Sequence, residues 1–200
     1  MLHLVRHGES EWNVAGRVQG QSASAGSLTA TGRAQAARAA ALLAGTRARA
    51  IVTSDLRRAR DTAVILAETL GLPVQRDPAL REQNLGELEG RAFAEGTVQE
   101  TIDELWRNPE RRPPGGESIL EMYERIHATL DRCAGQDLIL VTHGGPVRVA
   151  TTTADPRRGQ PVPRVAVGNA AVTSLQPRPS GVPASPRCSP GSRAHAATPR

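Results

Sequence analysis

Short apolar runs alternate with longer stretches of helical composition over the first 150 residues of the chain. Apolar runs predict strands at residues 2–6, 50–53 and 137–142, and a shorter strand opens at Val74. The run Leu-Ile-Leu-Val within residues 137–142 is typical of a buried strand. Strands that alternate with helices indicate an α/β fold with a largely parallel sheet.

Two of the intervening stretches have clear helix signals at their ends. Residues 29–43 are rich in Ala with Arg at intervals, and Thr29 is the predicted N-cap. A second helix is expected over residues 56–70, because Gly71 and Pro73 follow it and favour termination. The two helices lie between the first, second and third predicted strands.

The rest of the chain has one strong helix signal and two weaker elements. Ser118 and Glu121 have the spacing of a capping box, which predicts a helix that runs to about residue 133. Val147–Ala150 can begin a helix, but the threonines and the proline that follow shorten it. Residues 171–175 are expected to form one more strand.

The last quarter of the chain differs in composition from the part before it. Nine of the 15 prolines lie beyond residue 150, and from Gln176 onward Pro, Ser, Arg, Ala and Gly follow one another without periodicity. Such a composition buries too little apolar surface to order a chain, so residues 176–200 are expected to be a disordered tail. Residues 1–175 are expected to form one domain.

The net charge of +5 is unevenly distributed along the chain. Residues 1–150 hold 18 Arg and 19 acidic residues, a net charge of −1, whereas residues 151–200 hold 7 Arg and one Asp, a net charge of +6. The basic segment has no aromatic side chain for base stacking and no dense run of Arg, so nucleic-acid binding is not expected. All basic residues are Arg, which we attribute to genome composition rather than to phosphate binding.

The sequence has none of the features of a membrane or exported protein. No apolar stretch approaches the ~18 residues of a membrane span. An apolar strand begins at residue 2, where a leader would have its charged start. Cys133 and Cys188 have neither metal-ligand spacing nor a disulfide pattern. We therefore expect a cytoplasmic protein that does not contact a membrane.

Two predicted strands end in similar polar sequences. The first gives Arg6-His7-Gly8-Glu9, and the last gives His143-Gly144-Gly145. Ligands of open α/β sheets bind beyond the carboxyl ends of the strands, so two histidines delivered there can face one another across a pocket. The glycines allow backbone N–H groups to approach an anion closely. A single histidine at a strand end is more often structural, but the paired pattern favours a site.

Two further segments are expected to reach the same edge of the sheet. Ser54-Asp55-Leu56-Arg57-Arg58-Ala59 leads into a helix, whose N-terminus attracts phosphate and whose first turn supplies a bidentate arginine. For Arg57 and Arg60 we favour a solvated basic face. Leu80-Arg81-Glu82 follows the third strand, and a carboxylic acid there can protonate a leaving oxygen. Alternatively, Glu82 pairs with a nearby arginine, such as Arg6 or Arg81, and only holds the loop.

Several of these segments follow one another along the chain in a characteristic order. The set comprises Leu4-Val5-Arg6-His7-Gly8-Glu9-Ser10-Glu11-Trp12-Asn13, then Ser54–Ala59 with Thr62-Ala63, then Leu80-Arg81-Glu82 with Gly86 and Glu89-Gly90, and finally Val141-Thr142-His143-Gly144-Gly145. In this order they resemble the histidine phosphatase superfamily, the phosphoglycerate-mutase-like group. Weaker similarities lie at residues 28–32, 115–118 and 168–170. The resemblance implies a three-layer α/β sandwich with a mostly parallel sheet flanked by helices.

The resemblance also implies a role for each of six residues. His7 would be the nucleophile that becomes phosphohistidine. Glu82 would be the proton donor and then the base that activates water. The phosphoryl oxygens would be bound by basic and amide side chains, namely Arg6, Arg58, His143 and Asn13. No metal or cofactor is implied. Trp12 and Trp106 are as well suited to the core as to the pocket.

We favour a phosphomonoester hydrolase of the small phosphatase branch, acting on a small phosphorylated metabolite. The alternative is phosphoryl transfer of the phosphoglycerate mutase type, since residues 6–13 resemble both branches. The stretch from Glu82 to His143 is shorter than mutases usually have, the chain has no Lys, and Leu85 stands where mutases tend to have Tyr. The pattern is similar to small phosphatases, including the glucosyl-3-phosphoglycerate phosphatase kind. A non-catalytic binder of phosphorylated ligands is a second alternative, and a homodimer is left open.

Overall fold

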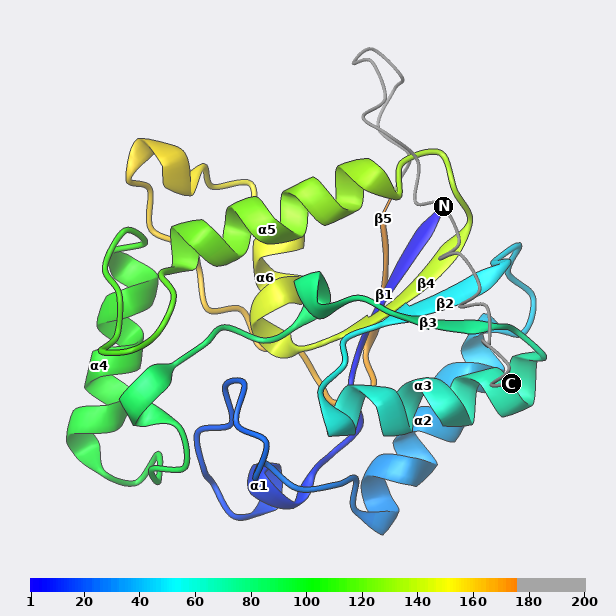
Figure 1. Cartoon of the computed structure of the whole chain (residues 1–200), viewed down its shortest axis with the longest axis horizontal. Helices are drawn as coiled ribbons and strands as arrows, with labels where there is room; N and C mark the ends of the chain where they lie inside the picture. Colours follow the sequence, from blue (N-terminus) through cyan, green and yellow to red (C-terminus); the bar gives the residue numbers. More distant parts are fainter. Residues whose placement is uncertain (176–200) are drawn as a thin grey trace, which may run out of the picture.

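A five-stranded sheet forms the centre of the computed structural model, which describes residues 1–175 (Figure 1). The strands lie in the order β3-β2-β4-β1-β5, and all neighbours are parallel except β5, which runs antiparallel to β1. Their bounds are β1 Leu2–Arg6, β2 Ala50–Thr53, β3 Val74–Arg76, β4 Leu138–Thr142 and β5 Val172–Leu175. These strands confirm the ones expected from the apolar runs. The expected tail lies outside the described residues.

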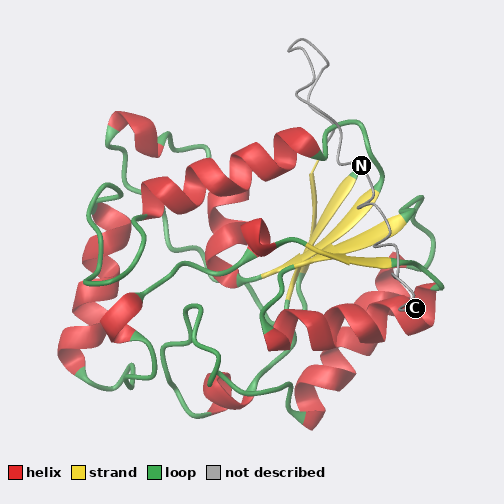
Figure 2. Ribbon diagram, in the orientation of Figure 1, coloured by secondary structure: helices red, strands yellow, loops and turns green. Residues whose placement is uncertain are grey.

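Helices cover both faces of the sheet (Figure 2). The helices are α1 Glu11–Val14, α2 Ala30–Leu43, α3 Arg57–Leu70, α4 Gly96–Arg107, α5 Ile119–Arg132 and α6 Gly144–Thr151. α2 and α3 pack on one face, and α5 and α6 pack on the other. The expected three-layer arrangement with a mostly parallel sheet is confirmed. Within residues 1–175, no helix has both the length and the apolar character that crossing a membrane requires.

Two apolar cores lie on the two faces of the sheet. Leu138 and Leu140 of β4 belong to the core beneath α5 and α6, whereas Ile139 and Val141 belong to the core beneath α2 and α3. Because successive side chains of a strand point to opposite faces, a strand between two cores is apolar throughout. All residues of β4 are buried, which explains the uninterrupted apolar run in its sequence.

The helix-end signals in the sequence correspond to hydrogen bonds and backbone angles in the structure. The Thr29 hydroxyl accepts the N–H of Gly32 at 3.0 Å and caps α2. Gly71 ends α3 with a φ of +66°, a left-handed conformation that favours glycine. Ser118 and Glu121 exchange both hydrogen bonds of a capping box at the start of α5. The three predicted helices are confirmed.

Apart from the four-residue α1, which the sequence analysis does not predict, two helices depart from the sequence predictions. α6 begins at Gly144 rather than near residue 147, and it is still a short helix that ends at Thr151. It buries Val147 and Val149 in the core that it shares with α5, so it covers its part of the sheet. α4 was not predicted, although its buried residues recur at helical spacing: Val98, Ile102, Leu105 and Trp106.

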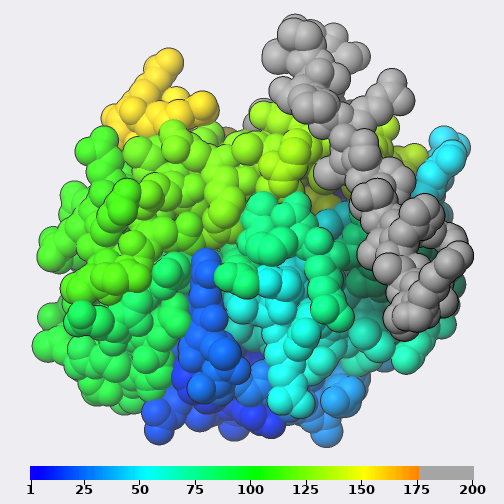
Figure 3. All heavy atoms as spheres, in the orientation of Figure 1, coloured from blue at the N-terminus to red at the C-terminus, as the bar shows by residue number. Residues whose placement is uncertain are grey.

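The carboxyl ends of β1, β2 and β4 meet at one edge of the sheet, because these strands are parallel neighbours. Arg6 pairs with Thr142 in the sheet, so the next residues, His7 and His143, leave the sheet side by side. In the face shown in Figure 3, the loop after α1 (blue) lies between the α4 region (green) and residues near the start of α3 (cyan). These segments surround the edge of the sheet where the predicted site residues gather.

Candidate active site

His7 follows β1 directly and is only 2 % exposed. Its Nδ1 lies 2.7 Å from the carbonyl oxygen of Gly8. Since a carbonyl oxygen can only accept, we assign the proton to Nδ1, which leaves a lone pair on Nε2. Burial lowers the pKa of His7 well below 6.5, and the charges of Arg58 and Arg6 lower it further. His7 is therefore a neutral imidazole whose Nε2 can act as a nucleophile.

Two buried arginines lie beside His7. Arg58, in the first turn of α3, donates from Nε to His7 Nε2 at 3.2 Å and from Nη2 to the Gly20 carbonyl at 2.8 Å. Burial lowers the pKa of Arg58 to about 10, so the side chain keeps its charge at neutral pH. Arg6 donates to the carbonyl of Val167, and its Nε is buried with no hydrogen-bond partner among the described residues. Both guanidinium groups suit a doubly charged phosphoryl group.

His143 caps α6 and is fully buried, with its ring centroid 5.2 Å from that of His7. Its Nε2 lies 2.8 Å from the hydroxyl of Ser54, which also accepts the N–H of Leu56. We assign the hydroxyl proton to the bond with Nε2, which leaves the ring proton on Nδ1. Nδ1 has no partner among the described residues. Because buried donors are rarely unpaired, Nδ1 is suited to bind a ligand oxygen.

Asn13 belongs to α1 and lines the same pocket as His7. Its Oδ1 accepts the backbone N–H of Ser10 at 3.0 Å and the Nδ2 group of Asn169 at 3.2 Å. With Oδ1 occupied, the side chain offers a ligand its own Nδ2 protons. Asn169 and the N–H of Ala170 also donate to the His7 carbonyl, at 3.3 and 3.1 Å. The segment 168–170, a weak similarity in the sequence, therefore holds two site residues in place.

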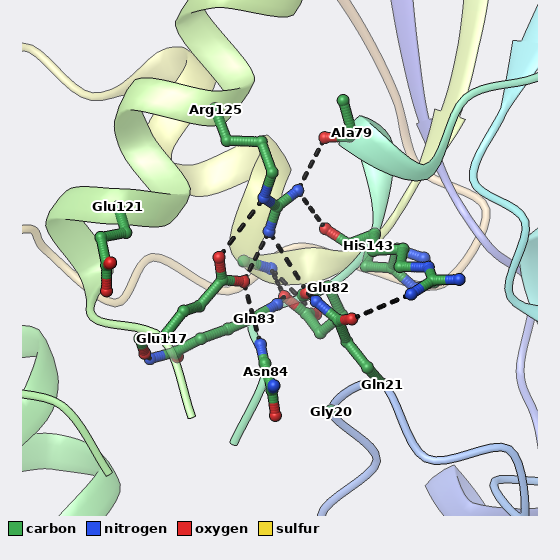
Figure 4. Close-up of polar contacts among 12 residues, drawn as sticks. Gly20, Gln21, Ala79, Glu82, Gln83, Asn84, Glu117, Glu121, Arg125 and His143 are labelled. Atoms are coloured by element: carbon green, nitrogen blue, oxygen red, sulfur yellow. Dashed lines mark hydrogen bonds and ion pairs between the residues drawn. The ribbon is translucent and has the colours of Figure 1, made fainter. Parts of the chain in front are cut away.

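Glu82 lies in an irregular segment that lines the pocket opposite His7. Both of its carboxylate oxygens lie 3.1 Å from the N–H of Gly145, at the start of α6, and Oε1 also accepts the N–H of Gln83 at 2.9 Å (Figure 4). Arg81 forms its ion pair with Asp55, between Nη2 and Oδ2 at 2.5 Å, rather than with Glu82. The Glu82 carboxyl is therefore held by backbone donors and turned toward the site.

The pocket in front of His7 has a volume of about 170 Å³. Several apolar side chains contribute to its lining, namely Val18, Leu85, Phe93, Ile102 and Trp106. Arg148 of α6 also lines it, with its guanidinium carbon 5.5 Å from the centroid of the Trp106 ring. The volume suits a small metabolite, since pockets for drug-sized ligands have ~300–1,000 Å³. Within residues 1–175, no group of three or more His, Cys, Asp or Glu side chains is arranged to hold a metal ion.

The structure brings all six predicted site residues together. Five of them line one pocket, and His143 packs directly against His7 behind it. Arg57 is exposed and has only a 3.9 Å ion pair with Asp61, as a solvated basic face predicts. Trp106 lines the pocket, and the helical pattern of α4 would have placed it on a buried face. Arg148 was missed because no local signal marks its contact with Trp106.

The family model of the histidine phosphatase superfamily (branch 1) matches residues 2–184. A probable phosphoglycerate mutase GpmB of Yersinia pestis (strain Pestoides F) is 42 % identical over 153 residues, which are 72 % of this chain and 69 % of that protein. Among solved structures, the mycobacterial glucosyl-3-phosphoglycerate phosphatase with VO3 is 31 % identical with a TM-score of 0.73, covering 86 % of this chain and 88 % of that one. TTHB049 from Thermus thermophilus is 33 % identical with a TM-score of 0.65, covering 86 % and 90 %. Together with the ordered motifs and the geometry around His7, these matches show that the chain belongs to the histidine phosphatase superfamily.

Proposed function

We propose that the chain hydrolyses phosphomonoesters of small metabolites, with His7 as the nucleophile that becomes phosphohistidine. The observation that carries this proposal is the hydrogen bonding of His7. Its Nδ1 donates to the Gly8 carbonyl at 2.7 Å, and the lone pair of its Nε2 accepts the Nε–H of Arg58 at 3.2 Å, a hydrogen bond that a bound phosphoryl group would replace. A neutral, oriented imidazole beside two guanidinium groups is the arrangement that attack on phosphorus requires.

In the first step, the lone pair of His7 Nε2 attacks phosphorus and a P–N bond forms. The ester P–O bond breaks, its electron pair moves to the leaving oxygen, and that oxygen takes the proton of the Glu82 carboxyl. Arg6, Arg58 and His143 Nδ1 bind the equatorial oxygens, over which negative charge is spread in the transition state. The alcohol then leaves the pocket.

In the second step, the Glu82 carboxylate takes a proton from a water molecule, whose oxygen attacks phosphorus. The P–N bond breaks and its electron pair returns to Nε2. Inorganic phosphate leaves, with His7 neutral and Glu82 protonated as at the start. The covalent intermediate divides one difficult displacement into two easier ones. The pocket volume of about 170 Å³ and the names of the relatives, which refer to phosphoglycerate and its glucosyl derivative, support a small phosphorylated metabolite as substrate.

A mutase is the second candidate, because a relative that is 42 % identical is named a probable phosphoglycerate mutase. A mutase returns the phosphoryl group of the intermediate to another hydroxyl rather than to water. The two reactions are separated by following 3-phosphoglycerate, with a bisphosphoglycerate primer, by ³¹P NMR. A phosphatase releases inorganic phosphate, whereas a mutase accumulates the 2-phospho isomer faster than inorganic phosphate.

The proposed intermediate is tested by acid and alkali treatment of enzyme quenched during turnover of a ³²P-labelled ester. We expect label that is acid-labile and alkali-stable, and a loss of ~10⁴ or more in kcat for His7→Ala. His3→Ala is the matched control, because His3 lies on the same strand but is hydrogen-bonded to the Ser174 hydroxyl at 2.8 Å. Near-normal turnover by His7→Ala would rule out a phosphohistidine at this position.

A further inference from the structure

Glu82, the proton donor proposed above, lies in a segment without regular secondary structure. This segment connects two 3₁₀ turns, Pro78–Leu80 and Gly86–Leu88. Catalytic groups need to be held within ~0.5 Å of the productive geometry, and loops do this less well than helices. The segment 79–84 must therefore be fixed by contacts from other elements. Most of the hydrogen bonds that other elements make to its main chain come from Arg125 of α5 and from Glu117, two residues before α5 begins (Figure 4).

Arg125 of α5 binds the backbone of this segment. Its Nη1 donates to the carbonyl oxygens of Ala79 and Arg81 at 2.6 and 2.9 Å. Its Nη2 donates to the carbonyl oxygen of Glu82 at 3.4 Å. Gln21 donates to the same Glu82 carbonyl at 2.9 Å from the other side. A guanidinium has five donors in a rigid plane and can bind several carbonyls at once, which an ammonium group cannot do in the same geometry.

Glu117 binds Arg125 and also the chain on the far side of Glu82. Its Oε1 lies 2.6 Å from Arg125 Nη2, and the two side chains are only 18 % and 22 % exposed. The same Oε1 accepts the N–H of Asn84 at 2.9 Å, and the side chain of Gln83 donates to the Glu117 carbonyl at 2.9 Å. A half-buried pair with these additional hydrogen bonds keeps its geometry better than an exposed ion pair does.

We infer that Arg125 and Glu117 are positioning residues for the proton donor. They do not touch the reacting atoms, but they fix the main chain on both sides of Glu82 and thereby the direction of its carboxyl. Glu117 directly precedes the N-cap Ser118, and Arg125 lies on the helix that this cap begins. The position of the proton donor is therefore fixed by contacts with α5 and the residues at its start, rather than by the loop that contains it. The inference rests on the proposed role of Glu82 in hydrolysis.

The test is a double-mutant cycle with Arg125→Lys and Glu82→Gln. The rate of His7 phosphorylation is measured before the steady state with glycerol phosphate, whose alkoxide needs a proton, and with p-nitrophenyl phosphate, whose phenolate hardly needs one. Since a misplacement of ~1 Å can cost ~10²-fold, we expect Arg125→Lys to slow the glycerol phosphate reaction by ~10–100-fold and the nitrophenyl reaction much less. In the Glu82→Gln background, Arg125→Lys should have no further effect.

Arg132→Lys is the matched control, because Arg132 lies on the same helix but pairs with Asp77 at 3.0 Å, before the segment. Both esters should react with it at the normal rate. The inference would be overturned if Arg125→Lys lowered the phosphorylation rate equally with both esters. It would also be overturned if Arg125→Lys lowered the rate equally in the wild-type and the Glu82→Gln backgrounds. Thermal unfolding identifies a variant that fails to fold, in which case Glu117→Gln gives the same cycle. If Glu82→Gln slows both esters equally, the acid role in the proposed function fails, whereas selective loss with Glu82→Gln and none with Arg125→Lys rejects only the positioning role.

Discussion

At the scale of single residues, hydrogen-bond partners decide which nitrogen of each histidine can react. The Gly8 carbonyl leaves Nε2 of His7 without a proton, and the Ser54 hydroxyl leaves Nδ1 of His143 as a donor. The two residues have similar sequence surroundings, since each directly follows a strand and precedes glycine. Their different partners suit one to the proposed role of nucleophile and the other to the proposed role of an oxygen-binding donor.

Arg58→Ala should lower kcat/KM for a phosphomonoester by ~10³–10⁵, the usual range for an arginine that stabilises a phosphoryl transition state. The side chain is 2 % exposed and contacts His7, whereas its neighbour Arg57 is exposed. Arg57→Ala is therefore the matched control and should change the rate less than about threefold, as surface charges do. A larger loss with Arg57→Ala than with Arg58→Ala would contradict the assignment.

Gly145→Ala should displace the Glu82 carboxyl. A Cβ at Gly145 would lie 2.2 Å from Glu82 Oε1, the mobile end of a flexible side chain, so Glu82 moves while the fold is retained. We expect phosphorylation by glycerol phosphate to slow by ~10²–10⁴, the contribution of a general acid, with much less change for p-nitrophenyl phosphate. Gly45→Ala is the control, because nothing lies within 4 Å of the Cβ position at Gly45. Equal slowing of both esters would speak against a displaced acid.

Acidification should destabilise the protein through its buried histidines. Burial lowers the pKa of both His7 and His143 well below 6.5 in the folded state, so below pH 6.5 the unfolded state binds more protons. As the pH falls below 6.5, each histidine therefore lowers the free energy of unfolding by about 1.4 kcal/mol per pH unit, until the pKa that it has in the folded state is reached. Urea unfolding between pH 7.5 and 5.5 measures this slope, and His143→Gln should reduce it. A free energy of unfolding that stays constant over this range would contradict the expectation.

At the scale of elements, α2 and the loop after β1 approach one another too closely for side chains. A Cβ at Gly32 would lie 2.0 Å from the Glu9 carbonyl oxygen, and one at Gly8 would lie 2.4 Å from that of Gly32. Both contacts involve backbone atoms, which cannot move aside without shifting the whole loop. Because that loop begins with His7, the packing of α2 helps to place the proposed nucleophile.

Gly32→Ala should therefore lower the free energy of unfolding by ~1–3 kcal/mol, as overpacking of a tight contact does, and should also reduce activity. Gly96→Ala is expected to change stability in the opposite direction. Gly96 begins α4, and a Cβ added there would have no other atom within 4 Å. That variant should be more stable by ~0.4–1 kcal/mol. Urea unfolding compares the two, and similar stabilities would show that the α2 contact relaxes easily.

At the scale of the whole molecule, three parallel strands and the loops around them gather positive charge at one edge of the sheet. Arg6 ends β1 and Arg58 lies in the first turn of α3 after β2, so in the proposed reaction guanidinium groups would neutralise the phosphoryl group in place of carboxylate-bound cations. The described residues also offer no group of three or more metal-binding side chains. This donor set predicts catalysis without a metal.

Activity should therefore survive EDTA within about twofold, since guanidinium groups alone can stabilise the transition-state charge. Initial rates are measured before and after chelation and gel filtration, with and without added Mg²⁺ or Mn²⁺. The control is a metal-dependent phosphatase treated in the same way, which should lose its activity. Loss of activity here, restored by either cation, would require a different mechanism.

Much of the fold follows from signals that are local in the chain. Thr29, Gly71 and Ser118 act on backbone groups only a few residues away, so the helix ends were predictable from residue types alone. The uninterrupted apolar run of β4 was enough to predict that the strand is buried on both faces. The six predicted site residues belong to contiguous motifs, and the resemblance to the family singles them out among the residues of those motifs. α4 is not predicted, because Glu95 and Gly96 give no cap signal at its start, although its buried residues have helical spacing and Pro109 follows its end.

Contacts between distant segments depend on the path of the whole chain. Arg125 holds backbone that lies 43–46 residues before it, and Asn169 binds Asn13 across 156 residues. No short-range pattern marks these partners, because their side chains meet only after the sheet and helices have packed. The local sequence thus determines which chemical groups stand at each strand end. The tertiary structure decides which groups surround the two histidines, where Glu82 points and which arginines face the pocket, since burial and most of these hydrogen-bond partners are set by neighbours distant in sequence.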